Sequence, residues 1–557
     1  MRALVVLALT CLLLSAPPEV VPHQLRLVNA AEEVGLSGFR EIGGGTPDKR
    51  YIPEVMSGGV CAADFDGDGW TDVVLVNGGS FDTAAHRTAP PAHGVFRNVN
   101  GHFVDVTART GIRNAGWGMG CATADFDGDG QIDLLITNFL GPLQLYRNDG
   151  NWHFTDVAAA TGLVGEPGGW YTGATFGDYD DDGRLDVAVT GYVRLDPVHL
   201  PDPDRTPECR HRGLVVNCGP RGLRGERDLL FHNEGNGRFR RVPEIDPDAY
   251  YGLGAVFLPL DDRGPVALYI ANDSTPNLLY RYRDGHLVEG AMDAGLALSE
   301  EGHEQAGMGI AWGDANRDGL LDLYVTNFVD DYNTLYENLG GGLFEDATRR
   351  ARLVQPTWLY MGWGTAFADF DNDGRDELIV ANGHVYPQVD TLHLPSAWRM
   401  PVQVFAARAD NTYEEIPRKD IDGPDAVGRG LATADFGNDG RIGAVINNLD
   451  GTPSLYRVAS GAASGHWIEL SLRGTRIADA TGAFLSCTWE GGRALRIVAS
   501  GGSYLSSHDR RVHVGIGTAP DAQCTIRWPG GRQQALPRLA ADHAYTVREG
   551  NAPAQLR

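Results

Sequence analysis

Basic residues are scarce in this sequence, and their scarcity excludes partners that need a positively charged face. The chain has 47 lysines and arginines against 73 aspartates and glutamates, which gives a formal net charge of −26. Nucleic acids and anionic membrane surfaces attract basic proteins, so neither is an expected partner. Much of the acid lies in short clusters instead of being spread along the chain.

Long apolar runs are also rare. Apart from residues 3–14, no segment is apolar enough to cross a membrane. That first run follows Arg2 and precedes Ser15 and Ala16, which is the pattern of a secretory signal peptide. We therefore predict a cleaved signal at residues 1–17, no transmembrane segment, and a mature protein that is secreted or periplasmic.

Cysteine is infrequent, with seven in 557 residues, one of them inside the predicted signal. The six that remain are an even number, as expected for disulfides in an oxidising compartment. Cys61 and Cys121 each precede an acidic cluster, and they either bridge neighbouring repeats or stay as free buried thiols. Two other pairs are predicted as disulfides: Cys209–Cys218 and Cys487–Cys524.

One nine-residue pattern, Asp-x-Asp-x-Asp-Gly-x-x-Asp, recurs along the chain. Intact copies span residues 64–72, 125–133, 178–186, 314–322 and 369–377, and eroded copies lie at 261–264 and 435–440. Each copy follows a small, Gly-rich apolar stretch and precedes an apolar strand. An internal repeat of this kind is the signature of a modular ring or array.

The pattern predicts a calcium-binding loop, because Ca²⁺ takes six to eight hard oxygen ligands and alternate residues of a tight loop can point inward together. A solvated acidic turn is the competing interpretation, which five copies in register disfavour. About five bound Ca²⁺ would bring the formal charge from −26 to −16. The predicted ligands are Asp64, Asp66, Asp68, Asp72, Asp125, Asp127, Asp129, Asp133, Asp178, Asp180, Asp182, Asp186, Asp314, Asn316, Asp318, Asp322, Asp369, Asp371, Asp373 and Glu377.

The repeats also predict the fold. Each unit carries two further strand landmarks, such as residues 145–148 and 154–157, and four short strands per unit are typical of a propeller blade. The expected fold is all-β: a seven-bladed β-propeller at residues 24–460, with a strand near residues 25–31 closing the last blade. A small β-sandwich-like domain is expected at residues 465–550, where the acidic loops stop and alternating strands begin.

The propeller rim opposite the acidic loops is the expected ligand face, because binding residues concentrate on loops of a rigid scaffold. Two insertions, 193–228 and 386–401, and several aromatic residues fall there. These aromatic residues either line a ligand site or fill the space between blades: Trp117, Trp170, Trp358, Trp363 and Trp398. No assembly motif stands out, so a monomer is expected.

Two functions compete, and a structural surface protein with no small ligand is a third possibility. The first is an extracellular binding or adhesion module for a protein, glycan or small-molecule ligand, with Ca²⁺ as a structural ion. The alternative is a metal-assisted hydrolase or lyase on the insertion rim, with His303, Glu304, Asp273 and His384 as catalytic candidates. A Ser-His-Asp triad at residues 506–509 is disfavoured, because triad groups converge from separate segments.

The acidic loops and their surroundings resemble the FG-GAP/VCBS repeats of integrin α-chain propellers. Residues 500–507, 512–517 and 526–531 are similar to an ASPIC/UnbV domain, so residues 25–545 resemble the family of cartilage acidic protein and its bacterial relatives. The resemblance implies extracellular calcium binding and interaction roles. The eroded loops at 261–264 and 435–440 depart from the pattern, and no metal is assigned to them.

Overall fold

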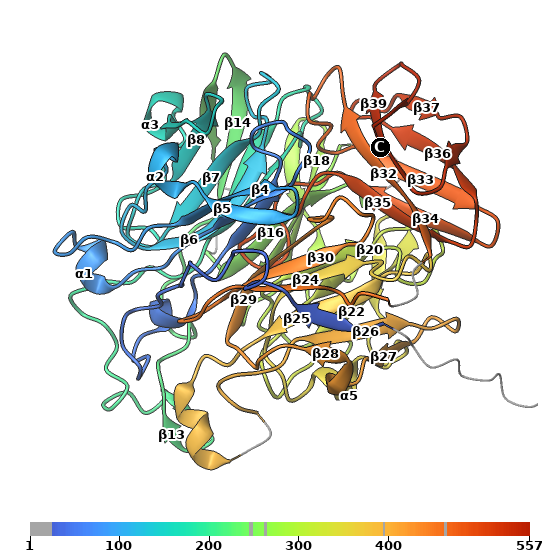
Figure 1. The fold of residues 1–557 in the computed structure, drawn as a ribbon. Coiled ribbons are helices and arrows are strands. Elements are labelled where there is room, and N and C mark those ends of the chain that lie inside the picture. Colours follow the sequence, from blue (N-terminus) through green and yellow to red (C-terminus); the bar gives the residue numbers. More distant parts are fainter. Residues whose placement is uncertain are drawn as a thin grey trace, which may run out of the picture.

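A computed structural model describes residues 25–243, 245, 249–260, 265–393, 396–461 and 465–556 of the protein. The predicted signal peptide at 1–17 and the eroded loop at 261–264 lie outside the described residues. The regular secondary structure of the described part is almost all β-strand, as the repeats predicted (Figure 1).

Six antiparallel sheets of four strands follow one another along the chain. Sheets 1 to 3 comprise β2 (Val60–Ala63), β3 (Asp72–Leu75), β4 (Gly94–Val99) and β5 (His102–Asp105); β6 (Gly118–Ala124), β7 (Asp133–Asn138), β8 (Gln144–Asn148) and β9 (Phe154–Asp156); and β10 (Tyr171–Gly177), β11 (Asp186–Gly191), β14 (Leu229–Gly235) and β15 (Arg238–Val242). Sheets 4 to 6 comprise β16 (Gly252–Leu258), β17 (Ala267–Asn272), β18 (Leu278–Arg283) and β19 (His286–Glu289); β20 (Ile310–Gly313), β21 (Asp322–Val325), β22 (Thr334–Gly340) and β23 (Leu343–Asp346); and β24 (Gly362–Ala368), β25 (Glu377–Asn382), β26 (Gln403–Ala407) and β27 (Tyr413–Glu415).

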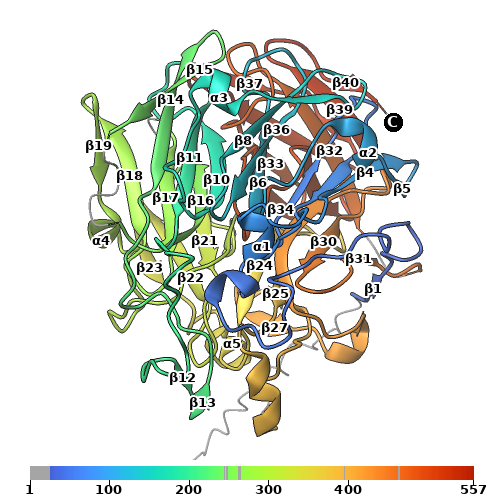
Figure 2. The same cartoon turned by 90° about the vertical axis from the view of Figure 1, so that its left-hand side faces the viewer.

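Sheet 7 joins the two ends of the ring. It contains β29 (Gly428–Ala434), β30 (Gly443–Asn448), β31 (Ser454–Val458), β1 (Leu27–Asn29) and β28 (Ile421–Asp422). The N-terminal strand β1 pairs antiparallel with β31, so that Leu27 lies opposite Val458 (Figure 2).

The first strands of the sheets contact one another in cyclic order, from β2 through β6, β10, β16, β20 and β24 to β29 and back to β2. This closed cycle is a β-propeller. Closure protects the edges of the sheets, which would otherwise expose unpaired backbone groups.

A repeated asparagine on the third strand ties sheets 1, 2, 3 and 5 to the sheet that precedes each of them. The Nδ2 of Asn98 donates to the carbonyl of Phe436 at 2.9 Å, and that of Asn148 donates to the carbonyl of Phe65 at 2.8 Å. These asparagines are buried, so each bond satisfies groups that water cannot reach. The Asn at the end of the strand landmark is therefore a structural residue of the ring.

Helices are short and lie in the connections. They are α1 (Phe81–Ala84), α2 (Thr107–Thr110), α3 (Ala158–Thr161), α4 (Ala291–Ala294), α5 (Val354–Thr357), η1 (Ile52–Val55), η2 (Pro387–Leu392) and η3 (Arg418–Asp420). In the described part of the chain, none is long and apolar enough to cross a bilayer. The longer insertion in sheet 3 carries the hairpin of β12 (Arg210–His211) and β13 (Leu214–Val215).

The C-terminal region forms two further sheets around its own core. One contains β35 (Val512–Gly517), β32 (His466–Arg473), β39 (His543–Arg548) and β40 (Ala554–Gln555). The other contains β34 (Gly492–Ile497), β33 (Phe484–Trp489), β36 (Asp521–Arg527) and β37 (Gln533–Ala535), with β38 (Leu539–Ala540) on β36.

The structure contains three disulfides. Cys209–Cys218 and Cys487–Cys524 are the two predicted pairs, and the second joins directly opposed residues of β33 and β36. Cys61 and Cys121 also pair, between β2 and β6. Of the two possibilities that the sequence left open, the structure has the bridge between neighbouring sheets.

Residues 499–508, here called the axial segment, leave the C-terminal domain and enter the centre of the propeller. Ser503 and Ile310 exchange backbone hydrogen bonds of 2.7 and 2.9 Å, and the Ser507 amide donates to the Val60 carbonyl at 2.9 Å. The Tyr504 hydroxyl donates to the Met56 carbonyl at 2.7 Å. The axis of the ring is therefore filled by chain from the C-terminal domain.

The C-terminal domain also covers the end of the propeller that carries the acidic loops (Figure 1). Each described loop contacts this domain through at least one hydrogen bond or ion pair. These contacts join Thr71 to Asp509 (2.6 Å), the Asp125 amide to Asp479 (3.0 Å), Asp181 to Arg476 (3.1 Å), the Arg317 carbonyl to Arg493 (3.0 Å), Asp376 to Arg496 (2.6 Å) and the Asp435 carbonyl to Arg511 (2.9 Å).

A substitution in the bidentate pair of Arg496 and Asp376 tests whether these contacts hold the C-terminal domain on the propeller. Replacing Arg496→Met leaves Asp376, whose side chain is 9% exposed, without its two guanidinium donors. We expect the free energy of unfolding to fall by about 3 kcal/mol, because breaking one half of a buried pair strands a charge. Guanidinium unfolding measures the change.

The exposed Arg548 gives the matched control, and Arg548→Met should change stability by about 0.5 kcal/mol or less. Equal losses for the two variants would show that the Arg496 contact does not hold the domain in place.

Candidate metal loops and a central cavity

The acidic loops connect the first and second strands of their sheets. They are named here by sheet: loop 1 (64–72), loop 2 (125–133), loop 3 (178–186), loop 5 (314–322), loop 6 (369–377) and the eroded loop 7 (435–443). In four of them, three carboxylates offer oxygens within 4.8 Å of one another: Asp64, Asp66 and Asp72; Asp125, Asp127 and Asp133; Asp178, Asp180 and Asp186; Asp369, Asp371 and Glu377. Loop 5 has an amide, Asn316, at its third position, and the Asn316 amide lies 3.1 Å from Asp318 and 3.4 Å from Glu337.

The ninth residue fixes the shape of each loop. In loop 2, Asp133 accepts from the Phe126 amide at 3.1 Å and from the Asn148 amide at 2.8 Å. Asp72, Asp186 and Asp322 make the equivalent pair of bonds. This carboxylate ties the loop to the third strand and holds the other acids in position.

The first residue of each loop accepts from the amide five residues later, for example Gly130 to Asp125 at 2.9 Å. Among the described residues, the Oδ1 atoms of Asp125, Asp314 and Asp369 are buried and have no hydrogen-bond partner. A buried carboxylate oxygen without a partner is costly. The loops therefore offer oxygens that a hard cation such as Ca²⁺ would satisfy, and the donor set fits that ion.

Electrostatics lead to the same conclusion. Burial raises the pKa of Asp64, Asp125 and Asp314 to about 6 and that of Asp178 to about 7, and neighbouring carboxylates add to each increase. The metal-free loops thus disfavour their own ionised form. A bound divalent cation would remove this penalty.

Some loops also meet a cationic side chain. In loop 1, Arg97 lies 2.8 Å from both Asp66 and Asp68. Across the described residues, no ion pair reaches the acids of loop 2, which makes loop 2 the clearest place to test a metal. In loop 7, which lacks the ninth acid, Arg511 of the C-terminal domain donates to the Asp435 carbonyl, so a guanidinium lies at the eroded loop.

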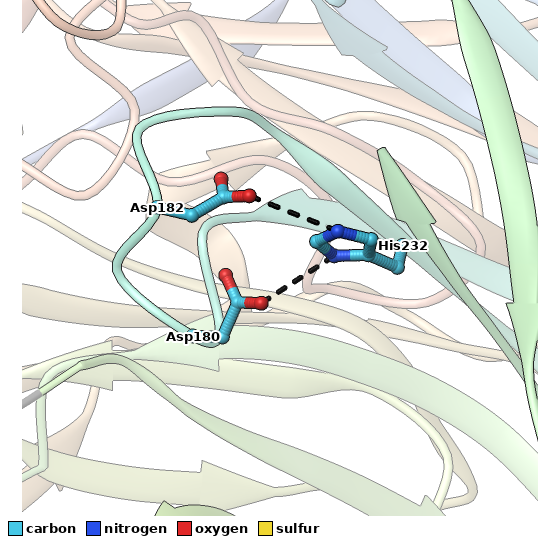
Figure 3. Close-up of side chains that lie close together, drawn as sticks. All are labelled: Asp180, Asp182 and His232. Carbon is cyan, nitrogen blue, oxygen red and sulfur yellow. Dashed lines mark ion pairs between the residues drawn. The ribbon is translucent and has the colours of Figure 1, made fainter. Parts of the chain in front are cut away.

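Loop 3 is joined by a histidine that the sequence pattern did not single out. His232 lies 3.4 Å from Asp180, 3.7 Å from Asp182 and 3.3 Å from Asp186, and its ring faces the loop (Figure 3). It occupies the third-strand position just before the repeated Asn, where β4 carries Arg97. Comparing the third strands of the repeats would have revealed it.

A cavity of about 910 Å³ lies at the other end of the propeller. Residues that begin first strands, such as Leu253 and Met308, and residues that follow second strands, such as Asp273 and Phe328, line it. The insertion with Cys209–Cys218 also lines the cavity. It therefore opens on the end away from the described acidic loops, on the face where the ligand was expected.

The four catalytic candidates do not form one group. Asp273 and Glu304 line the cavity. His384 is buried, and its Nδ1 accepts from the amides of Val385 and Tyr386. His303 is exposed in a turn closed by a backbone bond with Ser299. No hydrogen bond joins any two of the four in the described chain.

The tryptophans of the expected ligand face divide between two roles, because some fill the space between sheets and others reach the cavity or the surface. Trp117 and Trp170 are fully buried and pack against Phe139, the first edge-to-face and the second at a tilt. Trp363 is buried but reaches the cavity. Trp398 is partly buried against the same core, and Trp358 is 40% exposed.

Comparison with known proteins identifies both regions. Residues 64–136, 125–189 and 317–380 match the model of an FG-GAP-like repeat, and residues 474–554 match the model described as ASPIC and UnbV. The chain therefore contains FG-GAP-like repeats followed by an ASPIC and UnbV domain.

Curated relatives align with most of this chain. The chain is 25% identical to cartilage acidic protein 1 of Xenopus tropicalis over 510 residues, which is 86% of this chain and 71% of that protein. It is 24% identical to the Homo sapiens protein of the same name, over 87% of this chain and 71% of that one.

Solved structures match more loosely. A lectin of Agrocybe aegerita, studied for recognition of non-reducing terminal N-acetylglucosamine, matches 76% of this chain and 88% of its own at 14% identity and a TM-score of 0.36. The BP39L lectin of Burkholderia pseudomallei matches 73% of this chain and 97% of its own at 12% identity and a TM-score of 0.43.

The raised pKa values predict how the metal-free protein responds to pH. Asp64, Asp125, Asp178 and Asp314 have folded-state pKa values of about 6 to 7, above the ordinary value of 3.8. Folding therefore takes up protons near neutral pH, and stability falls as pH rises through these values. We expect the melting temperature of chelator-treated protein to drop between about pH 5 and pH 8.

Calcium supplies the control, because bound ions compete with these protons and should flatten or reverse the pH dependence. A melting temperature that rises with pH in chelator would contradict the raised pKa values.

Proposed function

We propose that this chain of FG-GAP-like repeats and an ASPIC and UnbV domain is an exported, calcium-binding β-propeller that acts as an extracellular binding module. The buried carboxylate oxygens without hydrogen-bond partners in loops 2, 5 and 6 carry the proposal. They need a cation, and in loops 2 and 6 the same residue belongs to a cluster of three carboxylates with oxygens within 4.8 Å of one another.

The first, third, fifth and ninth residues of loops 1, 2, 3, 5 and 6 would hold about five Ca²⁺ ions. The ions supply positive charge where the carboxylates repel one another, and they are structural. The ninth residue orients each of these loops, and in loops 2, 5 and 6 the first residue offers a buried oxygen without a hydrogen-bond partner. A bound ion at this end would also stiffen the surface on which the C-terminal domain lies.

The binding role rests on the cavity at the opposite end. Its wall combines the ring, which the third-strand asparagines and β1 hold together, with the disulfide-braced insertion at 193–228. A preformed pocket of this size is typical of ligand sites. The ligand classes that suit such a site are a small molecule, a glycan or a protein segment.

Export is supported by three disulfides, by the signal pattern at residues 1–17 and by the relation to cartilage acidic protein 1. The four catalytic candidates make no hydrogen bond to one another among the described residues, which favours binding over hydrolysis or elimination, since acid–base catalysis needs groups that act together on one substrate.

Calcium titration tests the proposal. We expect isothermal titration of chelator-stripped protein to show about five sites, and each site to add roughly 2.7 kcal/mol of stability at a hundredfold excess over its Kd. Asp127→Ala should remove one site. It should lower stability by about that amount in calcium and by little in chelator.

Glu32→Ala removes an exposed charge outside the loops and should leave the stoichiometry unchanged. If Asp127→Ala has the same effect in calcium and in chelator, loop 2 does not bind the ion.

A further inference from the structure

The lining of the central cavity combines carboxylates with aromatic rings, and we propose that it binds an organic cation, a ligand that carries an ammonium group on a compact scaffold. This inference rests on the proposed binding function and names the class of ligand.

Acidic groups outnumber basic ones in the cavity wall. The carboxylates of Glu208, Asp273, Glu304, Asp330 and Asp331 line it, and Arg221 is the one cationic side chain among its described lining residues. Asp330 pairs with Arg212 outside the wall. The four other carboxylates therefore share one guanidinium, and the cavity favours positive charge.

Two of these carboxylates are held by neutral donors. Asp273 accepts from the Tyr192 hydroxyl at 2.6 Å and from the Ser274 hydroxyl at 2.8 Å. Asp331 accepts from the Gln305 side-chain amide at 2.8 Å. Hydroxyl and amide donors orient a carboxylate without cancelling its charge, so both groups are fixed in place and still need a cation. Burial raises the pKa of each, and the partial opposing effects of Arg221 on Asp273 and of His303 on Asp331 do not offset it.

Aromatic rings complete the site. Tyr192, Phe328, Trp363 and Tyr386 line the cavity, and the negative face of such rings attracts organic cations. Arg429 stacks 4.0 Å from the Trp363 ring and donates to backbone carbonyls of Val55 and His384, so its charge is held behind the wall. An anionic ligand would meet only Arg221, and a neutral one would leave the acids uncompensated.

The cavity is shaped for a small molecule. At about 910 Å³ it lies within the usual range of ligand pockets. Met56, Leu253, Met308 and Trp363 form an apolar part of the wall, and Tyr504 of the axial segment packs against Trp363 at 4.6 Å between ring centroids. The C-terminal domain thus closes the axis, and entry is from the insertion side.

Three probes of one scaffold separate charge from shape: tyramine with an ammonium, tyrosol with a hydroxyl and 4-hydroxyphenylacetate with a carboxylate. Isothermal titration of calcium-loaded protein should show tyramine binding at least about tenfold more tightly than tyrosol, which corresponds to about 1.4 kcal/mol. The carboxylate probe should bind most weakly. Raising the salt concentration should weaken tyramine binding and leave tyrosol binding unchanged.

Substitutions in the cavity wall test whether its carboxylates cause the preference for tyramine. Asp331→Asn and Glu304→Gln should each weaken tyramine binding by several-fold and leave tyrosol binding unchanged. Glu490→Gln, at an exposed turn of the C-terminal domain, is the matched charge control and should have no effect. Asp273→Asn is a further test of the wall. Its tyramine binding is interpreted only if the melting temperature of the variant matches that of the parent protein.

Equal binding of tyramine and tyrosol, preference for 4-hydroxyphenylacetate, or no binding of tyramine at millimolar concentration would each overturn the inference. None of these outcomes affects calcium binding. Conversely, a failed calcium titration beside a selective tyramine response would remove the proposed ion sites and leave the cation cavity standing.

Discussion

The repulsion among carboxylates at one end of the propeller is the constraint on which the rest of the structure depends. Four of the described loops bring three carboxylates within 4.8 Å of one another, and loops 2, 3, 5 and 6 each bury a carboxylate oxygen without a hydrogen-bond partner. Such a set cannot stay ionised and folded without positive charge. Arginines supply part of that charge at loops 1 and 7, and we assign the remainder to Ca²⁺.

This constraint links the two parts of the chain. The C-terminal domain lies on the loops and sends residues 499–508 down the axis of the ring. Its arginines reach the loops from outside: Arg476 pairs with Asp181, and Arg496 pairs with Asp376. A change in the charge of the loops therefore alters the ion pairs that the domain makes with them. The axial segment connects the domain to the cavity wall, because Tyr504 packs against Trp363.

The sequence predicted the all-β propeller and two of the disulfides because both leave local signals: a repeat every few dozen residues and cysteines in one loop or domain. It could not decide the pairing of Cys61 with Cys121, since that depends on how neighbouring first strands lie. His232 was missed because the acidic pattern does not include the third strand, where only a comparison between repeats reveals it. The sequence did not predict the docking of residues 499–508, because its contacts join positions hundreds of residues apart and leave no periodic pattern in the sequence.

The central claim is that divalent cations in the acidic loops hold the C-terminal domain on the propeller. Hydrogen exchange of residues 499–508, measured in calcium and in chelator at one pH, tests it most directly. The account predicts slow exchange in calcium and clearly faster exchange in chelator, with the outer strand β19 little changed. Equal protection of the axial segment in both conditions, with the metal shown to be removed, would contradict it.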